Sequence, residues 1–170
     1  MGFPSVLKDM ILFDDGESQQ GEVPECTIPK LALKLEEWFS GGMLAPLDIT
    51  MGIDKLVFEY THNSLNQTTI SGFGLPAFDG KQLRFAGAYQ EDGSGDVQAV
   101  EVISHGKVTE LDFGTQKKGT VSTVKRKMTC AYYELNVDGV NWITIDVLNN
   151  VFLVMGKDMT AAIRAALGIS

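Results

Sequence analysis

Residues 27–52 alternate between apolar and polar side chains with a period of two. Three leucines fall on one face of an extended chain and three charged residues on the other: Leu31, Leu33 and Leu35 against Lys30, Lys34 and Glu36. This period is typical of a strand with one buried side, whereas a helix would space the leucines three and four apart. Gly41 and Gly42 interrupt the pattern before a second extended run at residues 44–51. We predict two long strands joined at a glycine corner, with an apolar face too large for one small domain to cover.

Alternation and turn residues predict further strands along the rest of the chain. They cover residues 10–13, 55–61, 82–89, 97–103, 108–113, 121–137, 142–147 and 151–155. Asp138-Gly139 is a strong signal for a tight hairpin. Residues 63–74 fit either a short helix or a loop. The period becomes helical only at the C-terminus, where Asp158 is the expected N-cap and Gly168 the expected stop.

Many strands with one or two short helices predict a mainly β subunit, a β-sandwich or barrel. A chain of 170 residues is long enough to bury a core and is expected to form a single domain. We divide it into an N-terminal arm or hairpin (1–24), a β core (25–156) and a C-terminal helix (157–168).

The charge and hydropathy of the chain exclude several classes of function. The net charge of −8 disfavours both a nucleic-acid binder held by phosphate contacts and attraction to an anionic membrane. No run approaches the roughly 18 apolar residues that a membrane-spanning helix requires. The N-terminal stretch shows no cleavage-site pattern, so we expect no signal peptide, no membrane anchoring, and synthesis in the cytoplasm.

No set of residues with catalytic or metal-binding spacing emerges. The two histidines, His62 and His105, each lie beside a turn, and nothing in their spacing brings them together with a carboxylate. We therefore expect neither enzymatic activity nor a cofactor. A soluble β-barrel binding module, with Trp38 and Trp142 lining a pocket, stays open as an alternative.

The two cysteines and the acidic strand residues each allow two interpretations. Cys130 fits a small apolar core residue, but a disulfide from Cys26 of one subunit to Cys130 of another would strengthen an extracellular particle. Carboxylates on the predicted strands fit a solvated face. If identical subunits closed into a ring, the same carboxylates would line a channel and repel the phosphates of passing DNA.

Several motifs together resemble the major tail tube proteins of contractile-tailed phages, a tube family that R-type pyocins share. The N-terminal third carries the most specific of them: Leu12-Phe13-Asp14-Asp15-Gly16, Gly21-Glu22-Val23-Pro24, Pro29-Lys30-Leu31 through Glu36, Gly41-Gly42-Met43, Ala45-Pro46 and Met51-Gly52. The likeness continues through Tyr132-Tyr133, Val137-Asp138-Gly139, Ile145-Asp146 and Leu167-Gly168.

The resemblance implies hexameric rings that stack into a hollow tube, with strands of neighbouring subunits joined in one intersubunit β-barrel. It implies no enzymatic activity and no cofactor. The implied partners are further copies of the chain, the sheath, the tape-measure protein, the baseplate and the tail terminator, with DNA only in transit. The implied location is a virion tail assembled in the bacterial cytoplasm. The tube of a headless R-type bacteriocin or related injection system is the alternative.

Within this frame, the arm and the glycine corner are expected to make contacts between rings, because both combine apolar residues with turns. The expected anchors are large apolar side chains: Phe3, Leu12, Phe13, Trp38 and Met43. Glu36, Asp48 and Glu59 are the expected acidic residues of the lumen.

Overall fold

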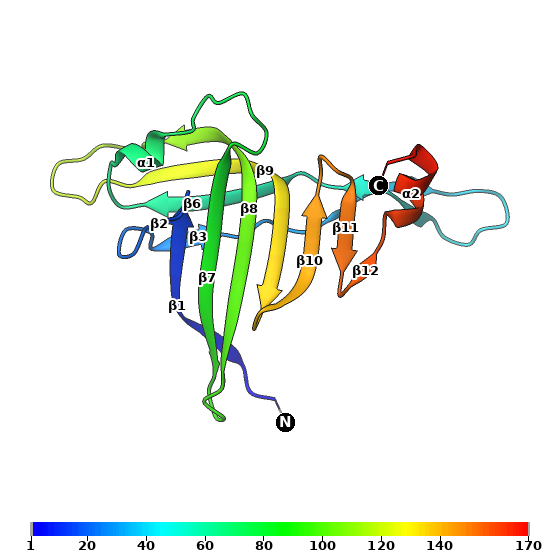
Figure 1. The fold of residues 1–170 in the computed structure, drawn as a ribbon, viewed down its shortest axis with the longest axis horizontal. Coiled ribbons are helices and arrows are strands. Elements are labelled where there is room, and N and C mark those ends of the chain that lie inside the picture. The colour runs from blue at the N-terminus through cyan, green and yellow to red at the C-terminus, as the bar shows by residue number, and fades with distance from the viewer. Residues whose placement is uncertain (1, 170) are drawn as a thin grey trace.

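The computed structural model describes residues 2–169, which form twelve strands and two short helices (Figure 1). The strands are β1 (Ser5–Asp14), β2 (Glu17–Ser18), β3 (Glu25–Thr27), β4 (Leu33–Trp38), β5 (Leu47–Ile53), β6 (Leu56–His62), β7 (Lys81–Glu91), β8 (Val97–Asp112), β9 (Val124–Val137), β10 (Val140–Asp146), β11 (Val151–Val154) and β12 (Lys157–Asp158). The helices are α1 (Gln67–Ile70) and α2 (Ala161–Leu167). The prediction of a mainly β fold with one or two short helices is confirmed.

Ten strands form one antiparallel sheet, and β4 and β5 form a separate hairpin. The large sheet runs in the order β12-β11-β10-β9-β8-β7-β1-β2. The first half of β9 also pairs with β6, which in turn pairs with β3. β8 and β9 are therefore shared by two parts of the sheet. The part with β3 and β6 runs along the long axis of the molecule, and the rest crosses it (Figure 1).

A glycine allows β8 and β9 to bend together between these two parts. The pairing of the two strands shifts at His105/Gly106 and again at Val108/Glu110. A Cβ atom at Gly106 would lie 2.3 Å from the backbone oxygen of Thr129, so only glycine fits here. The predicted break at residues 104–106 is wrong, because β8 continues through them as one bulged strand.

The core lies on the concave side of the bent sheet. Along β6 and the first half of β9, buried and more exposed side chains alternate, as a sheet with one covered face requires. The buried cluster draws from both parts of the sheet: Leu12, Leu56, Phe58, Tyr60, Leu83, Phe85, Val102, Met128, Cys130, Tyr133 and Ile145.

The N-terminal segment is part of the main sheet and not an arm. β1 pairs with β7 along nearly its whole length, and its last residues, including Leu12 and Asp14, are buried. Asp14-Asp15-Gly16 does lead into a returning limb, as the predicted hairpin requires, but this limb is only the two-residue β2. The expectation of an arm was wrong because the residues of β1 pair with residues 69 to 86 positions further along the chain, from Asp14 with Leu83 to Ser5 with Glu91, beyond the reach of a local pattern.

A buried ionic cluster joins β1, β6, β7 and β9. The carboxylate of Asp14 accepts hydrogen bonds from Arg126 Nη1 at 2.7 Å and from the Tyr60 hydroxyl at 2.9 Å. Lys81 Nζ lies 2.9 Å from the other oxygen of Asp14 and 2.7 Å from Asp15 Oδ2. Burial raises the pKa of Tyr60, so its hydroxyl remains a donor. The buried carboxylate of Asp14 and the exposed one of Asp15 thus balance the two buried cations Lys81 and Arg126.

Arg126 also fixes the segment that contains α1. Its guanidinium donates to the backbone oxygens of Thr68 at 3.1 Å and Ser71 at 2.9 Å. Asn66 caps this one-turn helix by accepting from the backbone N–H of Thr69 at 2.7 Å. A short helix is therefore present in the segment that the sequence left open, with Asn66 as its N-cap.

The C-terminus is a small extension of β10, β11, β12 and α2 at one end of the sheet (Figure 1). Asp138-Gly139 forms the predicted hairpin turn, and both residues have positive φ. α2 starts three residues after the predicted N-cap: Asp158 belongs to β12, and its carboxylate pairs with Arg164 of the helix. Gly168 ends α2 in the left-handed conformation, as predicted.

Candidate assembly surfaces

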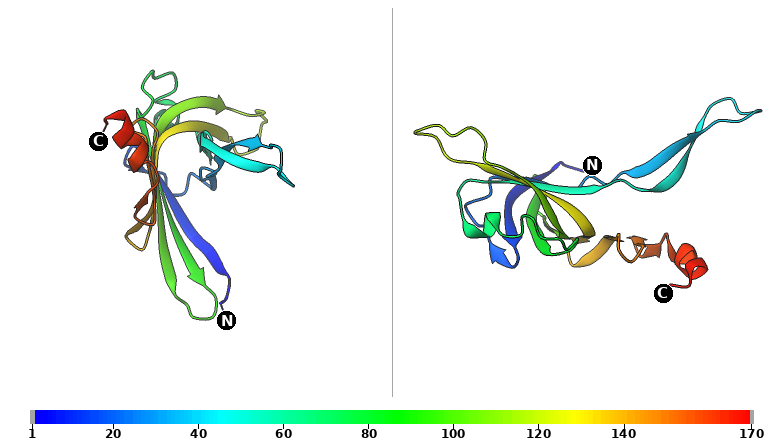
Figure 2. Two further views of the ribbon diagram at one scale, coloured as in Figure 1. Left: turned by 90° about the vertical axis from the view of Figure 1, so that its right-hand side faces the viewer. Right: turned by 90° about the horizontal axis from the view of Figure 1, so that it is seen from above.

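The β4–β5 hairpin projects from the body of the subunit without a covering layer (Figure 2). All six residues of β4 and six of the seven in β5 are exposed. Large apolar side chains lie along both limbs and the tip, among them Leu33, Leu35, Trp38, Phe39, Leu44, Leu47, Ile49 and Met51. The two predicted strands joined at a glycine corner are present, but they have only six and seven residues, and residues 28–32 lie outside them.

The strand register assigns the hairpin residues to two faces, because directly opposed residues of an antiparallel pair share a face. Trp38 lies opposite Leu47, and Glu37 lies opposite Asp48 on the other face. Each face combines apolar and acidic side chains. An isolated two-stranded hairpin is at best marginally stable in water, so contact with another surface would stabilise this one.

The predicted contact residues fall into two groups in the structure. Phe3, Trp38 and Met43 lie on the N-terminal end or the hairpin, and Phe3 and Trp38 are about half exposed. Phe13 is partly buried beneath Arg84, whose guanidinium carbon lies 4.7 Å from its ring centre. Leu12 is only 2% exposed and packs in the subunit core. Its side chain is not available to a neighbouring ring, which corrects the expectation for this residue.

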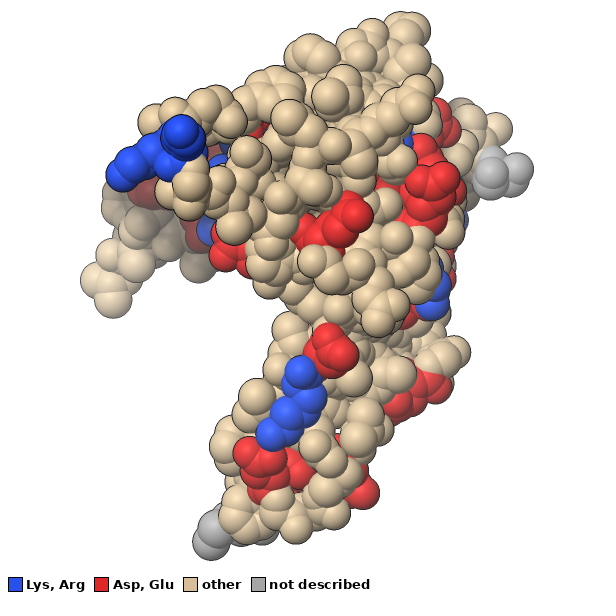
Figure 3. All heavy atoms as spheres, turned by 90° about the vertical axis from the view of Figure 1, so that its left-hand side faces the viewer, with Lys and Arg blue, Asp and Glu red and all other residues tan. Residues whose placement is uncertain are grey.

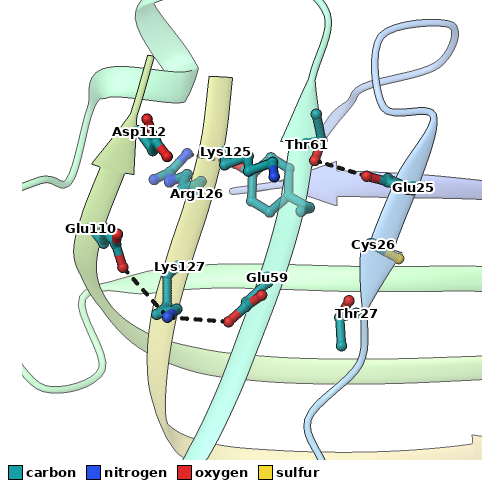
Figure 4. A pocket seen from close by; sticks show the side chains of 11 residues that line it. Glu25, Cys26, Thr27, Glu59, Thr61, Glu110, Asp112, Lys125, Arg126 and Lys127 are labelled. Atoms are coloured by element: carbon teal, nitrogen blue, oxygen red, sulfur yellow. Dashed lines mark hydrogen bonds and ion pairs between the residues drawn. The ribbon is translucent and has the colours of Figure 1, made fainter. Parts of the chain in front are cut away.

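The strands β3, β6, β9 and β8 carry a polar face on the side that points away from the core (Figure 4). A shallow depression of about 270 Å³ opens on it, lined by charged residues of the four strands β3, β6, β8 and β9: Glu25, Glu59, Glu110, Asp112, Lys125 and Lys127. Lys127 Nζ lies 3.3 Å from Glu59 and 3.4 Å from Glu110, and the hydrogen bonds that it donates to these two carboxylates raise the pKa of Lys127. On β6 and β9 the residues of this polar face alternate with buried residues that point into the core.

The three predicted lumen carboxylates do not share one surface. Glu59 lies on the polar face. Glu36 lies opposite Ile49, and Asp48 lies opposite Glu37, so Glu36 and Asp48 occupy opposite faces of the hairpin. The expectation that all three line one channel is corrected by this register. Sequence reasoning missed Glu25 on this face, and it passed over Glu110 and Asp112; their alternation with apolar residues was the available signal.

The cysteines do not fit the predicted disulfide between subunits. Both thiols are free, Cys130 is buried in the core of its own subunit, and Cys26 is partly buried. Burial raises the pKa of each thiol to about 11, which makes both slow nucleophiles. A Cys26 of another copy could reach Cys130 only if the core opened.

The residues that could have formed a ligand or metal site lie apart. Neither Trp38 nor Trp142 lines the depression on the polar face or the smaller one beside His105 and Tyr132. His62 is buried, and its Nε2 lies 2.7 Å from Gln19 Oε1. His105 instead packs edge-on against Tyr132. Within the described residues, no three His, Cys, Asp or Glu side chains gather closely enough to hold a metal ion, and no helix is long and apolar enough to cross a membrane.

Comparison with known proteins relates this arrangement to one family. The family profile of the phage tail tube protein FII matches residues 4–168. The tail tube protein of Escherichia phage P2 is 34% identical over 172 residues, covering 99% of this chain and all of the relative. The major tail tube protein of Serratia phage KSP20 is 30% identical over 172 residues, covering 99% of both chains.

Two solved structures share the fold at 8% sequence identity. One is the sheath/tube terminator of an extracellular contractile injection system (PVC), with a TM-score of 0.59 over 79% of this chain and 97% of that chain. The other comes from the sheath-tube complex of the same system, with a TM-score of 0.56 over 78% of this chain and 91% of that chain.

The profile match and the two relatives span almost the full length of this chain and agree on one type of protein. The chain therefore belongs to the phage tail tube protein family, whose members are structural proteins and not enzymes.

Proposed function

We propose that six copies of this chain form a ring, and that rings stack into the hollow inner tube of a contractile tail. The sixfold ring is what the resemblance to contractile tail tubes implies. DNA would pass through the bore of this tube during ejection. One structural neighbour is a sheath/tube terminator and the other comes from a sheath-tube complex, which supports a sheath and a terminator as partners. A tape-measure protein and a baseplate complete the proposed set.

The uncovered hairpin is the observation that carries this proposal. Trp38 and Leu47 face each other across it and are 49% and 59% exposed. Fully burying one such side chain contributes roughly 1.5–3 kcal/mol. A monomer that kept this surface in water would be prone to aggregation, whereas a tube buries it against other copies.

The polar face offers a lining for the bore. It carries four carboxylates against two lysines, Lys125 and Lys127, and Lys127 forms ion pairs with two of the carboxylates. Alternation along β6 and β9 sends the apolar side chains to the core and leaves charged ones outside, as a water-filled channel requires. In this arrangement Glu59 faces the lumen together with Glu25, Glu110 and Asp112, and the excess of acid over base repels DNA phosphates.

The test compares assembly of the wild-type chain with that of the W38S/L47S variant, by sedimentation and negative-stain electron microscopy in the presence of baseplates from the native particle. The matched control is V140S/V147S, which removes two apolar side chains that are 59% and 58% exposed on β10 and just after it. Circular dichroism checks that each subunit remains folded.

We expect wild type and control to form tubes, and W38S/L47S to remain a small folded species. Tubes of normal length from W38S/L47S, or a wild-type chain that stays monomeric at every concentration, would contradict the proposal. Native particles imaged with or without DNA-filled heads distinguish a phage from a headless bacteriocin.

A further inference from the structure

A second projecting segment lies at the opposite end of the molecule from the β4–β5 hairpin. Residues 113–123, which join β8 to β9, form a loop at one end of the long axis, and the hairpin forms the other end (Figures 1 and 2). In the view along the long axis, both project on the same side of the main sheet (Figure 2). Two copies placed head to tail along this axis therefore bring the loop of one near the hairpin of the next.

The charges of the two segments are complementary. The loop carries Lys117 and Lys118 and no acidic residue. Figure 3, which views the molecule from the loop's end, shows a group of basic side chains at the margin on which the loop projects. Both lysines are exposed, and among the described residues neither has an ion-pair partner within its own subunit.

One face of the hairpin lacks a cation. Glu37 and Asp48 lie directly opposite each other across β4 and β5, both exposed. Like charges in this position are mutually destabilising, and neither carboxylate forms an ion pair within residues 2–169. Lys34, the one basic residue in either limb, alternates onto the other face with Glu36. The subunit alone leaves this pair of carboxylates uncompensated.

The apolar side chains of the two segments are complementary as well. Leu33 and Leu35 share the face of Glu37 and Asp48, and both are about half exposed. The loop contributes Phe113 and Val121, which are also exposed. An interface between these segments would combine an apolar centre with charged residues at its margin, which is the usual composition of a stable contact.

We infer that Lys117 and Lys118 of one copy bind the Glu37–Asp48 face of the hairpin of a copy in the next ring. This inference rests on the proposed function and names the surface that receives the hairpin. The contact joins two different surfaces, so it repeats without closing and extends the tube ring by ring. Its charges fix the direction of stacking, because hairpin against hairpin or loop against loop places like charges together.

Charge exchange tests the contact. The variant K117E/K118E has an acidic loop and an acidic hairpin, and E37K/D48K has a basic loop and a basic hairpin. Each alone is expected to stack at least roughly tenfold less than wild type, because like charges then meet at every ring boundary. The two variants mixed are expected to restore tubes of alternating rings, as is the fourfold variant that carries both exchanges. The control is K55E/K157E, which makes the same change of net charge as K117E/K118E but at other positions on the surface.

The outcomes separate this inference from the proposed function. If wild type forms no tubes, the proposed function fails before the variants are compared. If wild type forms tubes and K117E/K118E forms them equally well, the loop is not the receiving surface. If both variants fold and form rings but neither the mixture nor the fourfold variant restores stacking, the lysines act elsewhere, such as on the sheath, and the inference is overturned.

Discussion

Replacing Asp14 with Asn is expected to destabilise the isolated subunit far more than the loss of an ordinary surface ion pair. Asp14 accepts from Arg126 and Tyr60 and lies 2.9 Å from Lys81, and all four residues are nearly inaccessible to solvent. Asn removes the negative charge and leaves two buried cations with only Asp15 to balance them. Breaking a buried pair in this way costs roughly 3–5 kcal/mol.

The stability lost in D14N is measurable by thermal unfolding of the dispersed subunit. At about 2–4 °C per kcal/mol for a chain of this size, the midpoint is expected to fall by roughly 6–20 °C. The control is E101Q, because Glu101 pairs with Arg84 at 2.8 Å in a partly exposed position where such pairs contribute at most about 1 kcal/mol. The double variant D14N/R126M is expected to cost less than the sum of its single changes. Equal midpoints for D14N and E101Q would refute the view that this cluster holds the strands together.

Three further predictions follow from single positions. Gly106→Ala is expected to destabilise the subunit by roughly 1–3 kcal/mol in urea unfolding, because the added Cβ would lie 2.3 Å from the backbone oxygen of Thr129. An unchanged urea midpoint would show that β8 and β9 can move apart without cost. The hydrogen bond from Arg164 lowers the pKa of Asp158 from 3.8 to about 2, so the stabilisation of α2 is complete above about pH 4 and is lost as pH falls towards 2. An NMR titration of Asp158 checks this, and a midpoint near 4 would contradict it. Because Cys130 is buried, it is expected to react with iodoacetamide only after unfolding. Non-reducing mass spectrometry of tubes is expected to show free thiols, and a disulfide-linked dimer would contradict the burial of Cys130.

Local patterns predicted the elements whose partners lie close in sequence. The hairpin of β4 and β5 and the turn at Asp138-Gly139 follow from alternation and turn chemistry within a short stretch. The continuity of β8 did not follow, because Ser104-His105-Gly106 resembles a loop. Gly106 instead allows β8 to approach β9 closely at Thr129, which lies more than 20 residues further along the chain.

The surfaces were harder to predict than the strands, because a face is defined by pairing across the whole chain. Glu36 and Asp48 look equivalent in sequence, yet the register places them on opposite faces. Leu12 looks like an apolar anchor on an arm, yet β1 pairs with β7 and places Leu12 in the core beside Phe85. One signal was available for the buried cluster: Arg126 stands at an inward position of an alternating strand, between the buried Val124 and Met128.

Amide hydrogen exchange across residues 33–53 tests most directly whether the hairpin is completed by other copies of the chain. In the dispersed subunit these amides are expected to exchange rapidly, because the hairpin is an uncovered two-stranded sheet, while amides of β8 and β9 remain protected. In assembled tubes the hairpin amides are expected to become as protected as those of β8 and β9. Equal exchange of residues 33–53 in the two states would contradict the account.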